Sequence, residues 1–194
     1  MIELDGKFIF VGGIHGVGKT TICSKISNEL AIEYLGASRV INEYKAQHSL
    51  DNNKITTQKE VDANQDILLT ALKEKTKKNN IYLLDGHFTL LSSEGKIKRL
   101  PFRVFEAMRP ILIIVLIDDV ENIASRLQHR DNIDISISLL NRMQLNEINY
   151  GDYISKKLEI PFYKIMMLDY DRLLTIVQQA KKIVCGVDPF KGTL

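Results

Sequence analysis

The sequence predicts an α/β fold with a central parallel β-sheet. Residues 7–11, 81–85 and 111–117 are short apolar runs of the kind that form strands. The last of them is rich in β-branched residues and does not alternate with polar ones, as expected of a strand covered on both faces. Helical patterns separate these runs, so parallel strands can be joined through helices. We therefore expect one α/β domain.

The first strand leads directly into residues 13–20, Gly-Ile-His-Gly-Val-Gly-Lys-Thr. This segment fits G-x-x-x-x-G-K-[ST], the pattern of a phosphate-binding loop, or P-loop. Its glycines let backbone N–H groups point at phosphate oxygens, and the helix expected over residues 20–30 adds free N-terminal donors. Lys19 is expected to reach the β- and γ-phosphates, and the Thr20 hydroxyl to coordinate Mg²⁺. A chance glycine-rich turn is the alternative, which the flanking strand and helix disfavour.

The composition narrows the class of protein. The chain has 194 residues, of which 45% are hydrophobic and 26% charged, which is ordinary for a globular domain. A formal net charge of +2 is too small to indicate nucleic-acid or membrane binding. Cys23 and Cys185 match no metal-binding spacing and are expected to be reduced thiols. Because we find neither a signal-peptide pattern nor a membrane-spanning run, we expect a cytoplasmic protein.

Periodicity and helix-stop residues predict the other elements. Gly36 is expected to end the first helix, and Arg39–Asn42 to form the second strand. The further elements are expected at about residues 58–77 (helix), 88–100 (loop or hairpin), 101–109 (helix), 120–131 (helix), 135–157 (helix) and 161–168 (strand). A last helix is expected after this strand, with Leu173, Val177, Ala180 and Val184 facing inward and Gly186 closing it. On the helix over residues 135–157, the core-facing stripe is expected to be Leu139, Met143, Asn146 and Tyr150.

A carboxylate ends the strand over residues 81–85. In proteins with a P-loop, an aspartate such as Asp85 holds Mg²⁺, directly or through water, or orients the attacking group. The alternative is that it caps the turn at Gly86, and we favour the functional interpretation because of the P-loop upstream. His87 either contacts the substrate or braces the loop, and the sequence does not decide between the two.

Charged residues also follow the strand over residues 111–117. Asp118 and Asp119 precede a helix, and Asp119 as its N-cap would be a sufficient explanation for both. Arg126 and Arg130 are four residues apart, so both guanidinium groups project from one face of that helix. Arginines suit phosphoryl groups because they stay charged and bind in pairs, so we favour a role at the P-loop over a solvated surface. Whether Arg142 points to the phosphates or to solvent stays open.

The order of these pieces resembles the nucleoside monophosphate kinases, most closely the archaeal-type adenylate kinases. The resemblance spans about residues 5–180 and rests on Gly-Ile-His-Gly-Val-Gly-Lys-Thr-Thr at 13–21, Asp85-Gly86-His87, Gly95, Leu100-Pro101, Val104, Pro110, Arg126-Leu127-x-x-Arg130, Gln144 and Tyr150-Gly151.

The resemblance implies a three-layer P-loop NTPase fold, a five-stranded parallel sheet in the order 2-3-1-4-5 with helices on both faces. It also implies a single kinase domain over residues 1–194, with an acceptor-binding insertion at about 43–78 and a short lid at about 128–136. The sequence departs from the family in three ways: His15 replaces the usual proline, the lid lacks an arginine, and residues 40–98 contain no arginine. The cations left for an acceptor phosphate are Lys45, Lys54 and Lys59, with Arg99 and Arg103 just beyond.

The resulting hypothesis is Mg²⁺-dependent phosphoryl transfer from ATP to a small acceptor, first of all a nucleoside monophosphate. A kinase of another small molecule or of a nucleoside, and a P-loop ATPase or regulatory nucleotide-binding module, are the alternatives. The sequence leaves the oligomeric state open. The residues expected to bind ATP are Gly13, His15, Gly16, Val17, Gly18, Lys19, Thr20, Thr21 and Arg126. The residues expected to be catalytic are Lys19, Asp85, Arg126 and Arg130, and those expected to hold the metal are Thr20 and Asp85.

Overall fold

The structure is a computed structural model that describes residues 4–50, 58–92, 94–184 and 186, with only the backbone of residues 58–60. The expectations for Cys185 and Lys54, and for the side chain of Lys59, concern groups outside this part of the chain.

A five-stranded parallel sheet forms the central layer, in the order β2-β3-β1-β6-β7. Counting only the strands of this sheet, the order is 2-3-1-4-5, which confirms the prediction. The strands are β1 (Lys7–Gly12), β2 (Glu33–Gly36), β3 (Ile81–Asp85), β6 (Leu112–Ile117) and β7 (Phe162–Met166). Thr89–Leu91 (β4) and Ile97–Arg99 (β5) pair as an antiparallel hairpin, one of the two structures expected for residues 88–100.

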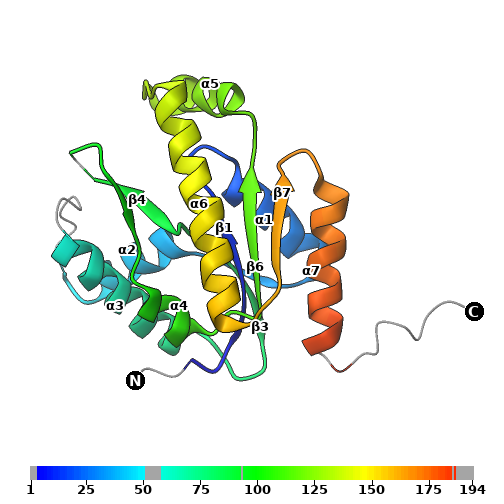
Figure 1. The fold of residues 1–194 in the computed structure, drawn as a ribbon. Coiled ribbons are helices and arrows are strands. Elements are labelled where there is room, and N and C mark those ends of the chain that lie inside the picture. The colour runs from blue at the N-terminus through cyan, green and yellow to red at the C-terminus, as the bar shows by residue number, and fades with distance from the viewer. Residues whose placement is uncertain (1–3, 51–57, 93, 185, 187–194) are drawn as a thin grey trace, which may run out of the picture.

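Helices cover both faces of this sheet, with α5 above the carboxyl ends of the strands (Figure 1). The helices are α1 (Lys19–Leu30), α2 (Ala37–Gln47), α3 (Gln58–Lys75), α4 (Phe102–Met108), α5 (Val120–Asp131), α6 (Ile137–Leu158) and α7 (Tyr170–Val184). Helices α2, α3 and α4 pack on one face and α1 and α7 on the other, while α6 contributes side chains to both cores.

Alternate residues of each central strand enter different cores, because successive side chains of a strand point to opposite faces. In β1, Phe8 and Phe10 belong to the core under α3 and α4, whereas Ile9 and Val11 belong to the core under α1 and α7. All four are buried. The central strands are therefore apolar throughout, as the sequence predicts.

The predicted second strand is wrong. Residues Arg39–Asn42 lie in α2, and β2 is Glu33–Gly36, so Gly36 ends a strand rather than a helix. Helix α1 ends instead at Leu30, where Ala31 adopts a left-handed conformation (φ 47°). Val40 and Ile41 favour a strand by intrinsic propensity, but both are buried on the inner face of α2. A short apolar run cannot by itself distinguish these two cases, and tertiary packing decides.

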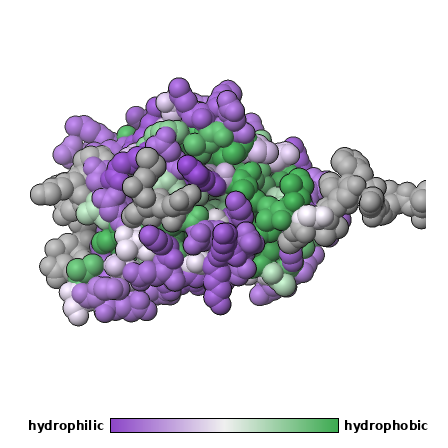
Figure 2. All heavy atoms as spheres, turned by 90° about the horizontal axis from the view of Figure 1, so that it is seen from below, coloured by the Kyte–Doolittle hydropathy of each residue, from purple (hydrophilic) through white to green (hydrophobic). Residues whose placement is uncertain are grey.

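The end of the molecule away from the P-loop is mostly hydrophilic, with smaller hydrophobic areas (Figure 2). Among the described residues, no helix is both long enough and apolar enough to cross a lipid bilayer.

Candidate active site

The P-loop connects the end of β1 to the start of α1. Its three motif glycines have positive φ angles, 142° at Gly13, 81° at Gly16 and 107° at Gly18. Gly18 is the residue before α1, and a Cβ there would lie 2.6 Å from the Cε of Met167. The backbone conformation therefore favours glycine at this position, whereas the contact with Met167 involves only the flexible end of a side chain. The loop leaves the amino end of α1 open for an anion, as the motif predicts.

Lys19 lies folded back against its own loop. Its Nζ donates to the carbonyl oxygens of Gly13 at 2.7 Å and Ile14 at 3.1 Å, and the residue is buried. Burial lowers the pKa of Lys19, while the charges of Glu147 and Asp85 raise it. An ammonium group so placed lies within the loop that is expected to receive the phosphates.

Thr20 and Asp85, the two residues expected to hold the metal, are in contact. The Thr20 hydroxyl donates to Oδ2 of Asp85 at 3.2 Å, and Asp85 is buried at the end of β3, paired with Val11 of β1. A hydroxyl and a carboxylate fit Mg²⁺, which takes oxygen ligands and completes its shell with water and substrate phosphates. The described residues contain no cluster of three or more histidine, cysteine or carboxylate side chains that could hold a metal without such help.

The sequence analysis missed Tyr34. Its hydroxyl donates to the same Oδ2 of Asp85 at 2.7 Å, and burial together with this hydrogen bond raises the pKa of Tyr34. The guanidinium of Arg39 lies 5.1 Å from the centre of the tyrosine ring. Tyr34 belongs to β2, the strand that the sequence analysis placed six residues too late, so no signal pointed to it.

Arg130 lies beside the P-loop, as expected. Its Nη2 is 3.3 Å from Nε2 of His15, and its Nε and Nη2 donate to the two carboxylate oxygens of Asp131 at 2.9 and 2.7 Å. Nε2 of His15 is also 3.2 Å from Asp131. The hydrogen bond from Arg130 is the main cause that lowers the pKa of Asp131. The end of α5 is thereby tied to the loop through exposed charged groups.

Arg126 has a different partner. Its Nη2 donates to Oδ2 of Asp118 at 2.6 Å, and its buried Nε has no hydrogen-bond partner among the described residues. Asp118 is buried and also accepts a hydrogen bond from the backbone N–H of Asp119 at 2.9 Å. Asp119 does occupy the N-cap position of α5, but its side chain makes no capping hydrogen bond. The capping explanation for the two carboxylates is therefore wrong, since Asp118 pairs with Arg126.

The sequence analysis also missed Glu147, which is fully buried in the core beside the loop. Its carboxylate accepts hydrogen bonds from the backbone N–H of Gly13 at 2.9 Å and of Thr89 at 2.6 Å. Burial raises the pKa of Glu147, against the lowering effect of its hydrogen bonds and of Lys19. The buried stripe of α6 in fact includes Leu140, Met143, Glu147, Tyr150 and Ile154. The expected stripe had Asn146 in place of the glutamate, although an acidic residue one position further was the available signal.

Three polar side chains on successive turns of α6 hold the backbone of other segments. The amide of Gln144 pairs with both the N–H (3.1 Å) and the C=O (3.0 Å) of Asp118 at the end of β6. Glu147 binds the P-loop and the start of β4, and the Tyr150 hydroxyl donates to the carbonyl of Leu100 at 2.7 Å. These contacts hold one face of α6 against the end of β6, the P-loop and the residue that follows β5.

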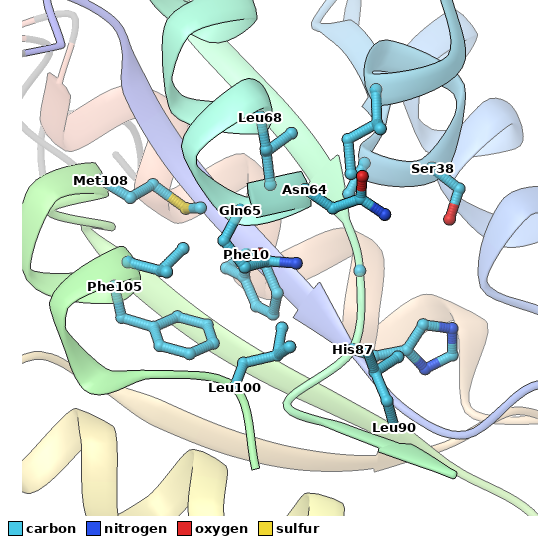
Figure 3. A pocket seen from close by; sticks show the side chains of 14 residues that line it. Phe10, Ser38, Asn64, Gln65, Leu68, His87, Leu90, Leu100, Phe105 and Met108 are labelled. Carbon is cyan, nitrogen blue, oxygen red and sulfur yellow. The ribbon is translucent and has the colours of Figure 1, made fainter. Parts of the chain in front are cut away.

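A pocket opens beside the P-loop, between β1, α2, α3, the hairpin and α4 (Figure 3). It encloses about 550 Å³ of empty space, counting its open mouth. Most of its lining is apolar or aromatic, and none of the described residues that line it is charged. Its lining residues include Phe10, Ile41, Leu68, Leu90, Leu100, Val104, Phe105 and Met108.

The polar side chains of the pocket are neutral. The amides of Asn64 and Gln65 point from α3 into the space (Figure 3), both residues are buried, and we find no hydrogen bond for either amide within the described chain. Ser38 and His87 lie near the mouth. Burial lowers the pKa of His87 well below the usual value, while the nearby backbone of Gly13 raises it. His87 therefore lines the pocket and lies close to the loop, so the two interpretations left open by the sequence are compatible.

The other residues considered for the site in the sequence lie partly in the core and partly on the surface. Val17 is buried in the core, so only its backbone can serve a nucleotide, whereas Thr21 is exposed on α1. Arg142 is exposed on α6. Lys45 is buried on α2, four residues after the pocket residue Ile41, but is not part of the pocket lining. Arg99, at the end of β5, and Arg103, on α4, do not line the pocket either.

Comparison with known proteins agrees with the P-loop and the fold described above. A family model described as an AAA domain matches residues 12–140. An adenylate kinase from Methanothermobacter thermautotrophicus is 26% identical over 145 residues, which cover 73% of this chain and 78% of that protein.

Solved structures share the fold at low identity. A shikimate kinase from Aquifex aeolicus has a TM-score of 0.54 and 14% identity, covering 93% of this chain and 99% of its own. A gluconokinase from Sinorhizobium meliloti has a TM-score of 0.52 and 13% identity, covering 96% and 99%. The chain therefore belongs to the AAA domain family, and with this fold and this loop it is an ATP-dependent P-loop kinase.

Proposed function

We propose that the protein transfers the γ-phosphoryl group of ATP to a small acceptor bound in the pocket beside the P-loop. The observation that carries this proposal is the position of His87, which lines the pocket and lies close to the backbone of Gly13 in the P-loop. An acceptor in the pocket would therefore have its reactive group next to the phosphates of the nucleotide. Phosphoryl transfer depends chiefly on such positioning and on neutralising charge.

The pocket supports an acceptor with a planar ring that can form hydrogen bonds. Each of the two amides offers a donor and an acceptor, and neither is hydrogen-bonded within the described chain, so both can serve a ligand. The aromatic rings of Phe10 and Phe105 provide apolar surface for a flat group. A nucleobase has both properties, so a nucleoside monophosphate is our first candidate, in keeping with the similarity to an adenylate kinase.

The residues of the donor side have separate roles in this proposal. The loop amides and Lys19 would bind the phosphates, with the ammonium group leaving its present carbonyl partners. Thr20 and Asp85 would hold Mg²⁺, which supplies charge neutralisation at the phosphates when bound. Arg130 lies close enough to the loop to approach the transferring group. Arg126 would have to exchange its partner Asp118 for a phosphate before it could contribute.

A second class of acceptor, one without a phosphate group, is also supported by the pocket. Because the described residues that line the pocket carry no charge, an uncharged acceptor such as a nucleoside or another small hydroxyl compound also fits.

The test is a panel of acceptors, monophosphates and the matching nucleosides, incubated with labelled ATP and Mg²⁺. We expect transfer to one class and a loss on the order of 10²- to 10³-fold in kcat for Lys19→Ala. Lys25→Ala is the matched control, because Lys25 lies over the ring of Tyr170, away from the loop. Slow ATP hydrolysis that no acceptor changes would support the regulatory module instead, and full transfer by Lys19→Ala would refute the mechanism.

A further inference from the structure

Glu147 forms a buried link between two segments that are distant in sequence. One carboxylate oxygen, Oε2, accepts from the N–H of Gly13 at 2.9 Å and from the N–H of Phe88 at 3.1 Å. The other, Oε1, accepts from the N–H of Thr89 at 2.6 Å, from its hydroxyl at 2.7 Å and from Phe88 at 3.0 Å. The side chain is completely shielded from solvent.

These contacts require a group that only accepts hydrogen bonds, and an ionised carboxylate is such a group. A glutamine of the same shape would direct an NH₂ group at an N–H donor on one side. The nearby ammonium of Lys19 adds an attractive charge. Because the site is buried, a lost acceptor leaves N–H groups without a partner, which is costly in the absence of water.

The two linked segments are the start of the P-loop and the strand behind the pocket wall. Gly13 accepts a hydrogen bond from Lys19, while Phe88 directly follows the pocket residue His87. The Phe88 ring also packs on the backbone next to the loop, since a Cβ on Gly12 would lie 2.1 Å from it. Neither segment can therefore move far without the other.

We propose that Glu147 is a positioning residue that sets the P-loop and the pocket wall at a defined separation, so that the nucleotide site keeps its shape only while this carboxylate is bound to Gly13. That the loop binds the phosphoryl donor and the pocket binds the phosphoryl acceptor rests on the proposed function, whereas the contacts of Glu147 do not depend on it.

The test compares Glu147→Gln with Thr89→Val and Thr76→Val. We would measure Mg·ADP affinity by calorimetry and exchange of the Gly13 amide hydrogen by NMR. Glu147→Gln should weaken Mg·ADP binding by about tenfold and speed exchange at Gly13. Thr89→Val removes one hydroxyl bond to Glu147 but leaves the bond to Gly13, so affinity should not change. Thr76→Val removes a comparable buried hydroxyl bond, to Leu72, and controls for a general loss of stability.

The outcomes separate clearly. Unchanged Mg·ADP affinity and unchanged exchange at Gly13 in Glu147→Gln would overturn the proposal, as would an equal loss of affinity in Thr76→Val. If Glu147→Gln does not fold, Glu147→Asp, which keeps the charge but shortens the reach, should show the same loss of affinity. If neither variant folds, the carboxylate serves the whole fold and the proposal is wrong. Neither measurement needs an acceptor, so failure of the kinase proposal in the acceptor panel would be seen separately.

Discussion

At the scale of single residues, the partners of Asp85 are not those of a turn cap. The carboxylate is buried, and its Oδ2 accepts hydrogen bonds from the hydroxyl groups of Thr20 and Tyr34. A cap would instead accept from backbone N–H groups of the following turn. The two hydroxyls orient the carboxylate toward the start of α1, where nucleotide phosphates are expected.

Asp85→Asn is expected to raise the Mg²⁺ concentration for half-maximal activity on the order of 10- to 100-fold, because the amide keeps the shape but loses the charge that attracts the cation. Tyr34→Phe, which removes only the 2.7 Å hydrogen bond to the carboxylate, should cause a smaller shift in the same direction. Magnesium titrations of ATP turnover provide the measurement, with the exposed Asp134→Asn as control. An unchanged magnesium requirement in Asp85→Asn would rule out the metal role.

At the scale of elements, β1 and the start of β4 pack closely because Gly12 has no side chain. The ring of Phe88 occupies that space and meets Phe10 and Phe105, with ring centres 4.9 and 5.3 Å away. The site is thus surrounded by large side chains that have little room to shift.

Gly12→Ala should therefore lower the free energy of unfolding by about 2–3 kcal/mol, as expected when a methyl group is forced into a filled core. Urea unfolding monitored by circular dichroism measures the change. Gly36→Ala is the matched control, because a Cβ there would meet its nearest neighbours only at 3.4 Å and the backbone is extended (φ −92°). Equal stability of the two variants would contradict the packing argument.

At the scale of the whole molecule, acid should weaken the fold through His87. Its pKa in the folded protein lies well below the usual value of 6.5, mainly because of burial. The unfolded chain therefore takes up a proton near pH 6.5 that the folded chain does not, and stability must fall as the pH decreases below that value. Above pH 6.5 both states are neutral and the full contribution is present.

As the pH is lowered from 7.5 to 5, the free energy of unfolding should decrease more steeply for the wild type than for His87→Gln. The difference between the two slopes should be at most about 1.4 kcal/mol per pH unit. Glu147, whose pKa is raised, contributes with the opposite sign, but it does so in both proteins. Urea unfolding at several pH values gives the two slopes. Identical slopes would show that His87 is not the group responsible.

Also at this scale, the fold was largely predictable and the site only in part. The P-loop, the strand ending at Asp85 and the apolar strand β6 are local patterns, so a single sequence reveals them. Glu147 and Tyr34 could not be recognised in this way, because their importance comes from partners 134 and 51 residues away along the chain. The pairing of Arg126 with Asp118 was hidden for a different reason, since an acidic residue before a helix is ordinarily a cap.

The spacing of Gln144, Glu147 and Tyr150 along α6 has a consequence for how this chain can vary in length. Inserting one residue between Gln144 and Tyr150 would rotate everything beyond it by about 100°, so that the three side chains could no longer meet β6, the P-loop and Leu100 together. The turns before and after α6 carry no such restriction. Related chains that keep these contacts should therefore gain or lose residues only at the two ends of this helix. The number of residues between Gln144 and Tyr150 should stay the same.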